Sequence, residues 1–192
     1  QSVETIVGWP GSRVQALAED AAGALWVGSD QAIARRDQGG WQVWQMPDAE
    51  PPTDVRALAW APAGGVYAAL WGAGLAHIDA HDAIDIQGVA AGLPEAFVQA
   101  LLLRGDAAHT QVWLGSGASG VLRLEPGRWR GFDEHDGLPS RVVVGVGAAR
   151  FSDGIEAQWV GTLGGAVRRM GDRWQALLPE RYRDRAVYDV LA

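Results

Sequence analysis

The chain has 192 residues, 48% of them apolar, and a formal net charge of −7, which excludes a general nucleic-acid binder because that class needs a basic surface. It contains no Cys, so disulfides and thiolate metal sites are excluded. No apolar run approaches the roughly 18 residues of a membrane span, so no membrane contact is expected within the chain.

The predicted strands begin at the N-terminus, where residues 3–8 have the character of an outer strand. A longer unit follows, with a largely apolar run from Val14, a turn of Asp, Ala and Gly, and the phrase LWVGS at 25–29. Small polar residues then form a turn, a third strand has basic ends, and an outer strand reads WQVW at 41–44. This order predicts a four-stranded antiparallel sheet whose first strand is buried.

The same unit is repeated along the chain. Further units begin at Val55, Val98 and Val142, and the sequence ends with the first strand of a fifth unit. The aromatic residue of the second strand recurs at spacings of 41, 46 and 46 residues, as Trp26, Tyr67, Trp113 and Trp159. A repeat of about 40–50 residues made of short strands is typical of a β-propeller blade.

The sequence therefore predicts an all-β protein, a β-propeller of four-stranded antiparallel blades in a single domain, 1–192. Complete blades are expected at 14–46, 55–87, 98–132 and 142–177, with terminal strands at 3–8 and 186–191. Because the middle strands of a fifth unit are missing, we favour a segment of a larger propeller, whose end faces are covered by remaining blades or by self-association. The alternative is a small ring closed by the four units.

The repeated aromatic residue has a structural interpretation. Neighbouring blades pack face to face, and a large flat side chain fills the wedge between them. The following Gly permits a close backbone approach that a Cβ would block. The predicted blade-core residues are Trp26, Tyr67, Trp113 and Trp159.

A binding site is predicted from propeller geometry, because two sets of loops meet around the axis on one face, here called the mouth. The loops that lead into the first strands supply Arg13, Arg56, Gln99 and Arg141. The loops between second and third strands supply Asp30, Trp71, Ser116, Ser119 and Thr162. Bidentate hydrogen bonds from Arg and stacking on Trp71 suit a saccharide or an acidic small molecule.

Catalytic and metal-binding motifs are not evident in the sequence. The His residues, His77, His81, His109 and His135, do not share a strand at a ligand spacing, and no nucleophile or phosphate-binding motif is present. The sequence predicts no catalytic residue, no metal site and no cofactor.

The repeat resembles the two-component regulator propeller family. The resemblance lies in EDAAGALWVGS at 19–29 and QWVGTLGGAVR at 158–168, and in the Gly-Leu-Pro loops AGLPEAFV at 91–98 and DGLPSRVV at 136–143. The second unit departs from the pattern, since VYAALWG at 66–72 lacks both the Trp and the Gly of the phrase. The third unit has extra residues at 106–110.

The resemblance implies a non-enzymatic sensor segment in the periplasm, attached to a two-component or diguanylate-cyclase type receptor. Ligand binding would change blade or subunit packing and pass that change to an output domain. Members of the family tend to recognise saccharides or polymer fragments. The alternatives are a propeller lyase or hydrolase of the virginiamycin-lyase type and a protein-interaction scaffold.

Overall fold

The computed structural model describes residues 12–37, 40–47, 53–150, 156–171, 173–177 and 186–187. These residues form four antiparallel sheets, each with its strands in sequence order. The first sheet has β1 (Val14–Glu19), β2 (Leu25–Ser29), β3 (Ala32–Asp37) and β4 (Gly40–Gln45). The second has β5 (Asp54–Trp60), β6 (Val66–Trp71), β7 (Gly74–Ile78) and β8 (Ile84–Gln87). The third has β9 (Val98–Arg104), β10 (Gln111–Ser116), β11 (Val121–Glu125) and β12 (Arg128–Phe132). The fourth has β13 (Val143–Arg150), β14 (Glu156–Thr162), β15 (Gly165–Met170) and β16 (Arg173–Ala176).

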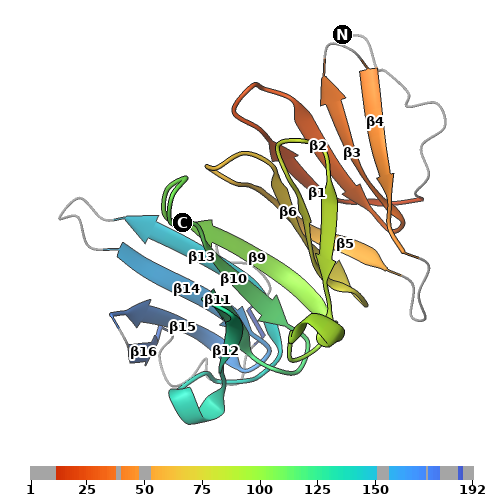
Figure 1. Cartoon of the computed structure of the whole chain (residues 1–192). Helices are drawn as coiled ribbons and strands as arrows, with labels where there is room; N and C mark the ends of the chain where they lie inside the picture. The colour runs from red at the N-terminus through yellow and green to blue at the C-terminus, as the bar shows by residue number, and fades with distance from the viewer. Residues whose placement is uncertain are drawn as a thin grey trace, which may run out of the picture.

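The sheets are the blades of a propeller, as predicted from the sequence. Figure 1 shows them fanned along an arc, with the first and fourth blades at its two ends. The inner strands β1, β5, β9 and β13 pack beside one another in that order, so each blade contacts the next through its first strand. Sheet bounds and expected blade ranges differ by no more than one residue at either end.

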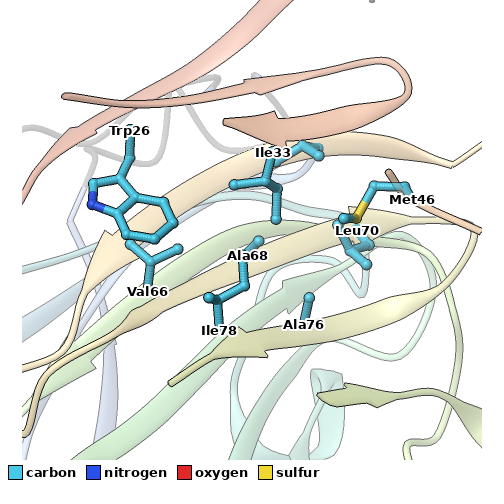
Figure 2. Packing of buried hydrophobic residues seen from close by; sticks show 9 residues of the cluster. Trp26, Ile33, Met46, Val66, Ala68, Leu70, Ala76 and Ile78 are labelled. Atoms are coloured by element: carbon cyan, nitrogen blue, oxygen red, sulfur yellow. The ribbon is translucent and has the colours of Figure 1, made fainter. Parts of the chain in front are cut away.

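Each interface between blades is an apolar core. The first lies between blades 1 and 2 and contains the side chains of Trp26, Ile33, Leu70 and Ile78, all at most 1% exposed. Figure 2 shows the Trp26 indole lying over Val66 in this cluster. The aromatic residue of the repeated phrase thus faces the next blade along the chain.

An aromatic residue and an Arg or His residue oppose each other across the second and third strands of every blade. The pairs are Trp26 with Arg35, Tyr67 with His77, Trp113 with Arg123 and Trp159 with Arg168. In blade 3 the Arg123 guanidinium carbon lies 5.2 Å from the centre of the Trp113 ring, and that of Arg169 from blade 4 lies 5.1 Å from it. Cation–π contacts therefore join neighbouring blades.

The Gly-Leu-Pro loops connect one blade to the next and insert a Leu into the core. Each loop contains a short 3₁₀ turn, η1 (Val89–Ala91) or η2 (Glu134–Asp136), and its Gly has a positive φ. Leu93 is 1% exposed between blades 2 and 3, and Leu138 is 3% exposed between blades 3 and 4. Burial of these side chains fixes the path by which the chain returns to the axis.

The predicted terminal strand at 3–8 lies outside the described residues, as does most of the strand predicted at 186–191. Within the latter, the backbone N–H of Val187 donates to the carbonyl oxygen of Thr162 at 2.9 Å. The equivalent hairpin of blade 3 also bonds to the segment that follows its blade, but as the donor, since Gly120 N–H donates to the carbonyl of Arg141, just before β13. In the part of the chain that the structure describes, no helix is long and apolar enough to cross a membrane.

Candidate ligand-binding mouth

Every inner strand has a β-bulge at its second or third residue. In β5 the pairing passes from Val55–Leu70 to Ala57–Ala69, which leaves Arg56 as the extra residue. Equivalent register shifts in the other inner strands leave Gln15, Gln99 and Val144 as the extra residues. A bulge redirects the side chain of its extra residue and is frequent beside binding sites.

Arg56 and Trp71, both predicted for the mouth, are in contact. The Arg56 guanidinium carbon lies 5.4 Å from the centre of the Trp71 ring, and Arg56 Nη2 lies 2.8 Å from Asp54 Oδ2. The Trp71 ring also lies 5.0 Å from the ring of Phe97, at an interplanar angle of 52°. Phe97 belongs to the segment that leads into blade 3, so a half-buried aromatic pair joins blades 2 and 3 at the mouth.

Gln99 joins blade 3 to blade 4. Its Nε2 donates to the carbonyl oxygen of Val143 at 2.8 Å. Gln15 occupies the same position in β1, and within the described residues its buried Nε2 has no hydrogen-bond partner. A buried amide donor without a partner carries a desolvation cost that a bound acceptor would remove.

The predicted hydroxyl ligands have structural partners. The buried hydroxyls of Ser116 and Thr162 donate to the carbonyl oxygens of Gly120 and Gly165, each at 2.8 Å, and so close their own hairpins. The backbone N–H of Ser119 donates to Ser116 Oγ at 2.9 Å and to Glu95 Oε1 at 3.1 Å. Ser116 and Thr162 are 0% exposed, so a ligand at the mouth would not reach their hydroxyls without movement of the hairpins.

The other predicted charges are engaged in local contacts. Asp30 Oδ1 accepts a hydrogen bond from the backbone N–H of Ser12 at 2.7 Å, and the Arg13 N–H lies 3.4 Å from the same oxygen. The Ser12 hydroxyl, which also donates to Asp30, is the main cause that lowers the pKa of this carboxyl. Arg13 itself is exposed.

Arg141 is paired with two acidic side chains of the preceding loop. Its Nη2 lies 3.1 Å from Asp133 Oδ2, and its Nε donates to Glu134 Oε2 at 2.5 Å. The side-chain hydrogen bond to Glu134 raises the pKa of Arg141 and is also the largest cause of the lowered pKa of Glu134. Arg141 and Arg56 both form ion pairs with carboxylates in the structure, and an anionic ligand would compete with these carboxylates for the guanidinium groups.

The bulge was not visible in the sequence. The four residues predicted from the loops that lead into the inner strands therefore do not occupy equivalent positions. Arg56 and Gln99 are bulge residues, whereas Arg13 and Arg141 precede their inner strands. Gln15 was missed, although the second residue of VQALA, VRALA and VQALL is a signal that would have found it. Phe97 and Glu95 were also missed, since their contacts with Trp71 and with the hairpin of blade 3 depend on packing between blades.

The His side chains lie on elements other than β5 and β6, which carry Arg56 and Trp71. His77 is half-buried in β7, with its ring centre 4.1 Å from that of Tyr67, while His81 and His109 are exposed in turns. His135 is exposed in η2, where its Nδ1 lies 3.0 Å from Asp133 Oδ1. Among the described residues no group of three or more His, Cys, Asp or Glu side chains is arranged to hold a metal ion.

Comparison with known families gives a match for the first repeat of the chain. Residues 8–31 match the two-component regulator propeller family. This segment is similar to one repeat of that family. The matched segment runs through β1 and β2 and contains the LWVGS phrase, the bulge residue Gln15 and the mouth residues Arg13 and Asp30. The family resemblance seen in the sequence is therefore confirmed.

Solved structures share the architecture of this propeller. The extracellular domain of a hybrid two-component system from B. thetaiotaomicron matches with a TM-score of 0.69 at 15% identity, covering 88% of this chain and 25% of that chain. The extracellular domain of a one-component system from the same organism matches with a TM-score of 0.69 at 20% identity, covering 96% of this chain and 24% of that chain. Virginiamycin B lyase from Staphylococcus aureus matches with a TM-score of 0.64 at 13% identity, covering 87% of this chain and 56% of that chain.

At these identities the structural likeness establishes the fold, and the propeller described here spans about a quarter of the length of the two B. thetaiotaomicron domains. No curated protein sequence matches the chain significantly.

Proposed function

We propose that this propeller is a ligand-sensing, non-enzymatic segment of a bacterial receptor, lying in the periplasm and linked to a two-component or diguanylate-cyclase type output. Two findings support the proposal: the two-component regulator propeller repeat and the likeness to extracellular domains of such systems. The observation that carries it is the contact of Arg56, Trp71 and Phe97 across the boundary of blades 2 and 3 at the mouth.

The contact offers a physical route from binding to signalling. An anionic ligand would compete with Asp54 for the Arg56 guanidinium. Of the five N–H donors of this group, the two on Nη2 face Asp54, and the three on Nε and Nη1 point elsewhere. Because Arg56 lies over Trp71, movement of the guanidinium changes the packing of Trp71 against Phe97 of the next blade. The ligand shifts blade packing to the extent that it binds one arrangement more tightly.

The ligand class that suits this mouth is an acidic saccharide. A sugar ring presents C–H groups that can stack on an indole, and a carboxylate or sulfate can accept bidentate hydrogen bonds from Arg. A neutral oligosaccharide would use the same aromatic surface but gain nothing from Arg56.

Isothermal titration with uronate-containing and neutral oligosaccharides tests the proposal. We expect saturable binding of the acidic series, weakened at least tenfold by Arg56→Ala and by Trp71→Ala, and unchanged by Arg173→Ala at an exposed site on the outer strand β16. Equal binding by the Arg56→Ala variant would place the ligand elsewhere. Mass spectrometry of the recovered oligosaccharide separates the lyase alternative, because turnover of the probe would contradict a non-enzymatic role.

A further inference from the structure

An aromatic residue of the outer strand completes two of the blade interfaces. In blade 1 the ring of Trp44 stacks 5.3 Å from that of Trp26, and in blade 3 the ring of Phe132 stacks 5.8 Å from that of Trp113. Trp44 pairs with Ile33, and Phe132 pairs with Val121, which is the equivalent position of the third strand. In these two interfaces the outer half is thus filled by a stacked pair of aromatic residues at equivalent positions.

Blade 2 lacks this aromatic residue. The third-strand residue equivalent to Ile33 and Val121 is Leu75, and its partner on the outer strand is Gln87. Beneath it the cross-strand pair is Tyr67 and His77, smaller than the Trp and Arg of the other blades. The interface between blades 2 and 3 therefore has less side-chain volume in its outer half than the interfaces on either side.

A cleft of about 410 Å³ lies at this place, between β8 and β12. Gln87 and Asp85 line it from blade 2, and Leu124, Arg128 and Trp129 line it from blade 3. The mouth residues Arg56 and Trp71 are not among its lining residues. The cleft is therefore distinct from the mouth, and Gln87 in its wall occupies the strand position that Trp44 and Phe132 have in their own blades.

The intact interface between blades 3 and 4 shows what the cleft would accept. There Phe132 meets Trp174 of the next blade edge to face, with ring centres 5.9 Å apart and an interplanar angle of 73°. Trp174 pairs with Arg169 as Trp129 pairs with Leu124, so the two Trp residues are equivalent. A planar ring placed beside Gln87 would meet Trp129 in the geometry that aromatic pairs prefer.

The charges around the cleft select the substituent on that ring. Arg128 is already paired with Glu125, with Nη2 3.0 Å and Nε 3.1 Å from Oε2. Asp85 accepts a hydrogen bond from the Gln87 amide at 3.1 Å and lies opposite the half-buried His77 in the strand register. The carboxylate of Asp85 is exposed, so it can bind a cation that approaches the rim of the cleft.

We propose that the cleft between β8 and β12 binds a planar aromatic small molecule with a cationic substituent, whose ring takes the place that Trp44 and Phe132 fill in the neighbouring interfaces. The ring packs against Trp129 and Leu124, and the cation faces Asp85. Gln87 at the wall can donate to or accept from a polar atom of the ring.

Isothermal titration of the whole chain with tryptamine, indole and indole-3-acetate tests this site. We expect one site per chain, with affinity falling in that order, since the amine gains the attraction of Asp85 and the carboxylate loses it. Gln87→Trp should abolish binding and raise the melting temperature by about 2–4 °C, because it fills the cleft from within. Gln45→Trp, at an exposed position of β4, is the matched control and should bind like the parent chain.

Phe132→Gln is the reciprocal variant, because it opens the equivalent space between blades 3 and 4. A folded Phe132→Gln chain should bind two molecules of neutral indole in place of one. Tryptamine should gain no second site, because Arg130 stands there at the position that Asp85 has in blade 2. The proposal is overturned if none of the probes saturates, or if Gln87→Trp binds tryptamine as well as the parent. Loss of tryptamine binding in Arg56→Ala but not in Gln87→Trp would move the probe to the mouth and would also contradict it.

Discussion

Gly28 and Val55 touch across the boundary between the first two blades: a Cβ built on Gly28 would lie 2.4 Å from Val55 Cγ1. The same relationship recurs between blades 3 and 4, where a Cβ on Gly115 would lie 2.7 Å from Val143 Cγ1. Val55 and Val143 each stand directly before the extra residue of the bulge in their inner strand. The Gly of the repeated phrase is thus the surface on which the next inner strand rests.

Substitution of either Gly by Ala should destabilise the propeller. The added methyl group has no space, since Val55 also belongs to a packed β-strand, and overpacking of this kind costs about 1–3 kcal/mol. Chemical denaturation of Gly115→Ala should show the loss as a lower midpoint. Gly131→Ala is the control, because its Cβ would lie 3.7 Å from the nearest atom, in ordinary contact, and an unchanged midpoint is expected there.

Trp113 and Trp159 should differ in their contribution to stability although they occupy the same place in the repeat. Trp113 is 1% exposed, and the guanidinium carbons of Arg123 and Arg169 lie 5.2 and 5.1 Å from the centre of its ring. Trp159 is half-buried, because no described sheet follows the fourth blade. Trp113→Ala should cost about 3–5 kcal/mol, and Trp159→Ala should cost at least about 1 kcal/mol less. Equal losses in denaturation would show that something covers the fourth blade as fully as blade 4 covers the third.

Leu93 should act as a structural anchor of its loop. Its side chain is 1% exposed in the core between blades 2 and 3, and a Cβ on Gly74 would lie 2.7 Å from its Cδ2. Leu93→Ala should cost about 2–5 kcal/mol in urea denaturation, with the higher value if the core fails to collapse onto the space. Leu163→Ala, at a side chain 42% exposed, should leave the midpoint nearly unchanged, and a similar loss there would argue against a specific role for Leu93.

The fold could be predicted because the sequence pattern of one strand is repeated several times along the chain. LWVGS, VWLGS and QWVGT mark one strand of three blades, so their spacing gives the period, and apolar runs on one side identify the inner strands. The bulge could not be predicted in this way. Val-Gln-Ala and Val-Arg-Ala have no residue that requires a bulge, and the extra residue becomes evident only when the two paired strands are placed in register.

The candidate sites were less accessible to sequence reasoning for a related reason. Arg56 could be assigned to the mouth, but its pairing with Asp54 and its place over Trp71 depend on side-chain directions that a repeat pattern does not specify. The cleft beside Gln87 is a property of two blades together. Gln87, which occupies the position of an aromatic residue in blades 1 and 3, lines it from one side, and Trp129 of the next blade lines it from the other.

His77 should make the stability of the propeller depend on pH near neutrality. Burial lowers the pKa of His77 from its ordinary value of 6.5, against the opposing influence of Asp79 and Asp85. A group with a lowered folded pKa binds its proton more readily in the unfolded chain, so its contribution to stability is present above the unfolded pKa and is lost as pH falls below it. We expect the melting temperature to decline between pH 7 and pH 5.

The matched variants are His77→Phe and His81→Phe. His77→Phe keeps a ring against Tyr67, whose centre lies 4.1 Å from that of His77, and removes the titration, so its melting temperature should depend less on pH over this range. His81 is exposed, with its side chain at 91%, and His81→Phe should follow the parent profile. If His77→Phe kept the full pH dependence, the loss would have to come from the carboxylates, and His77 would have no part in it.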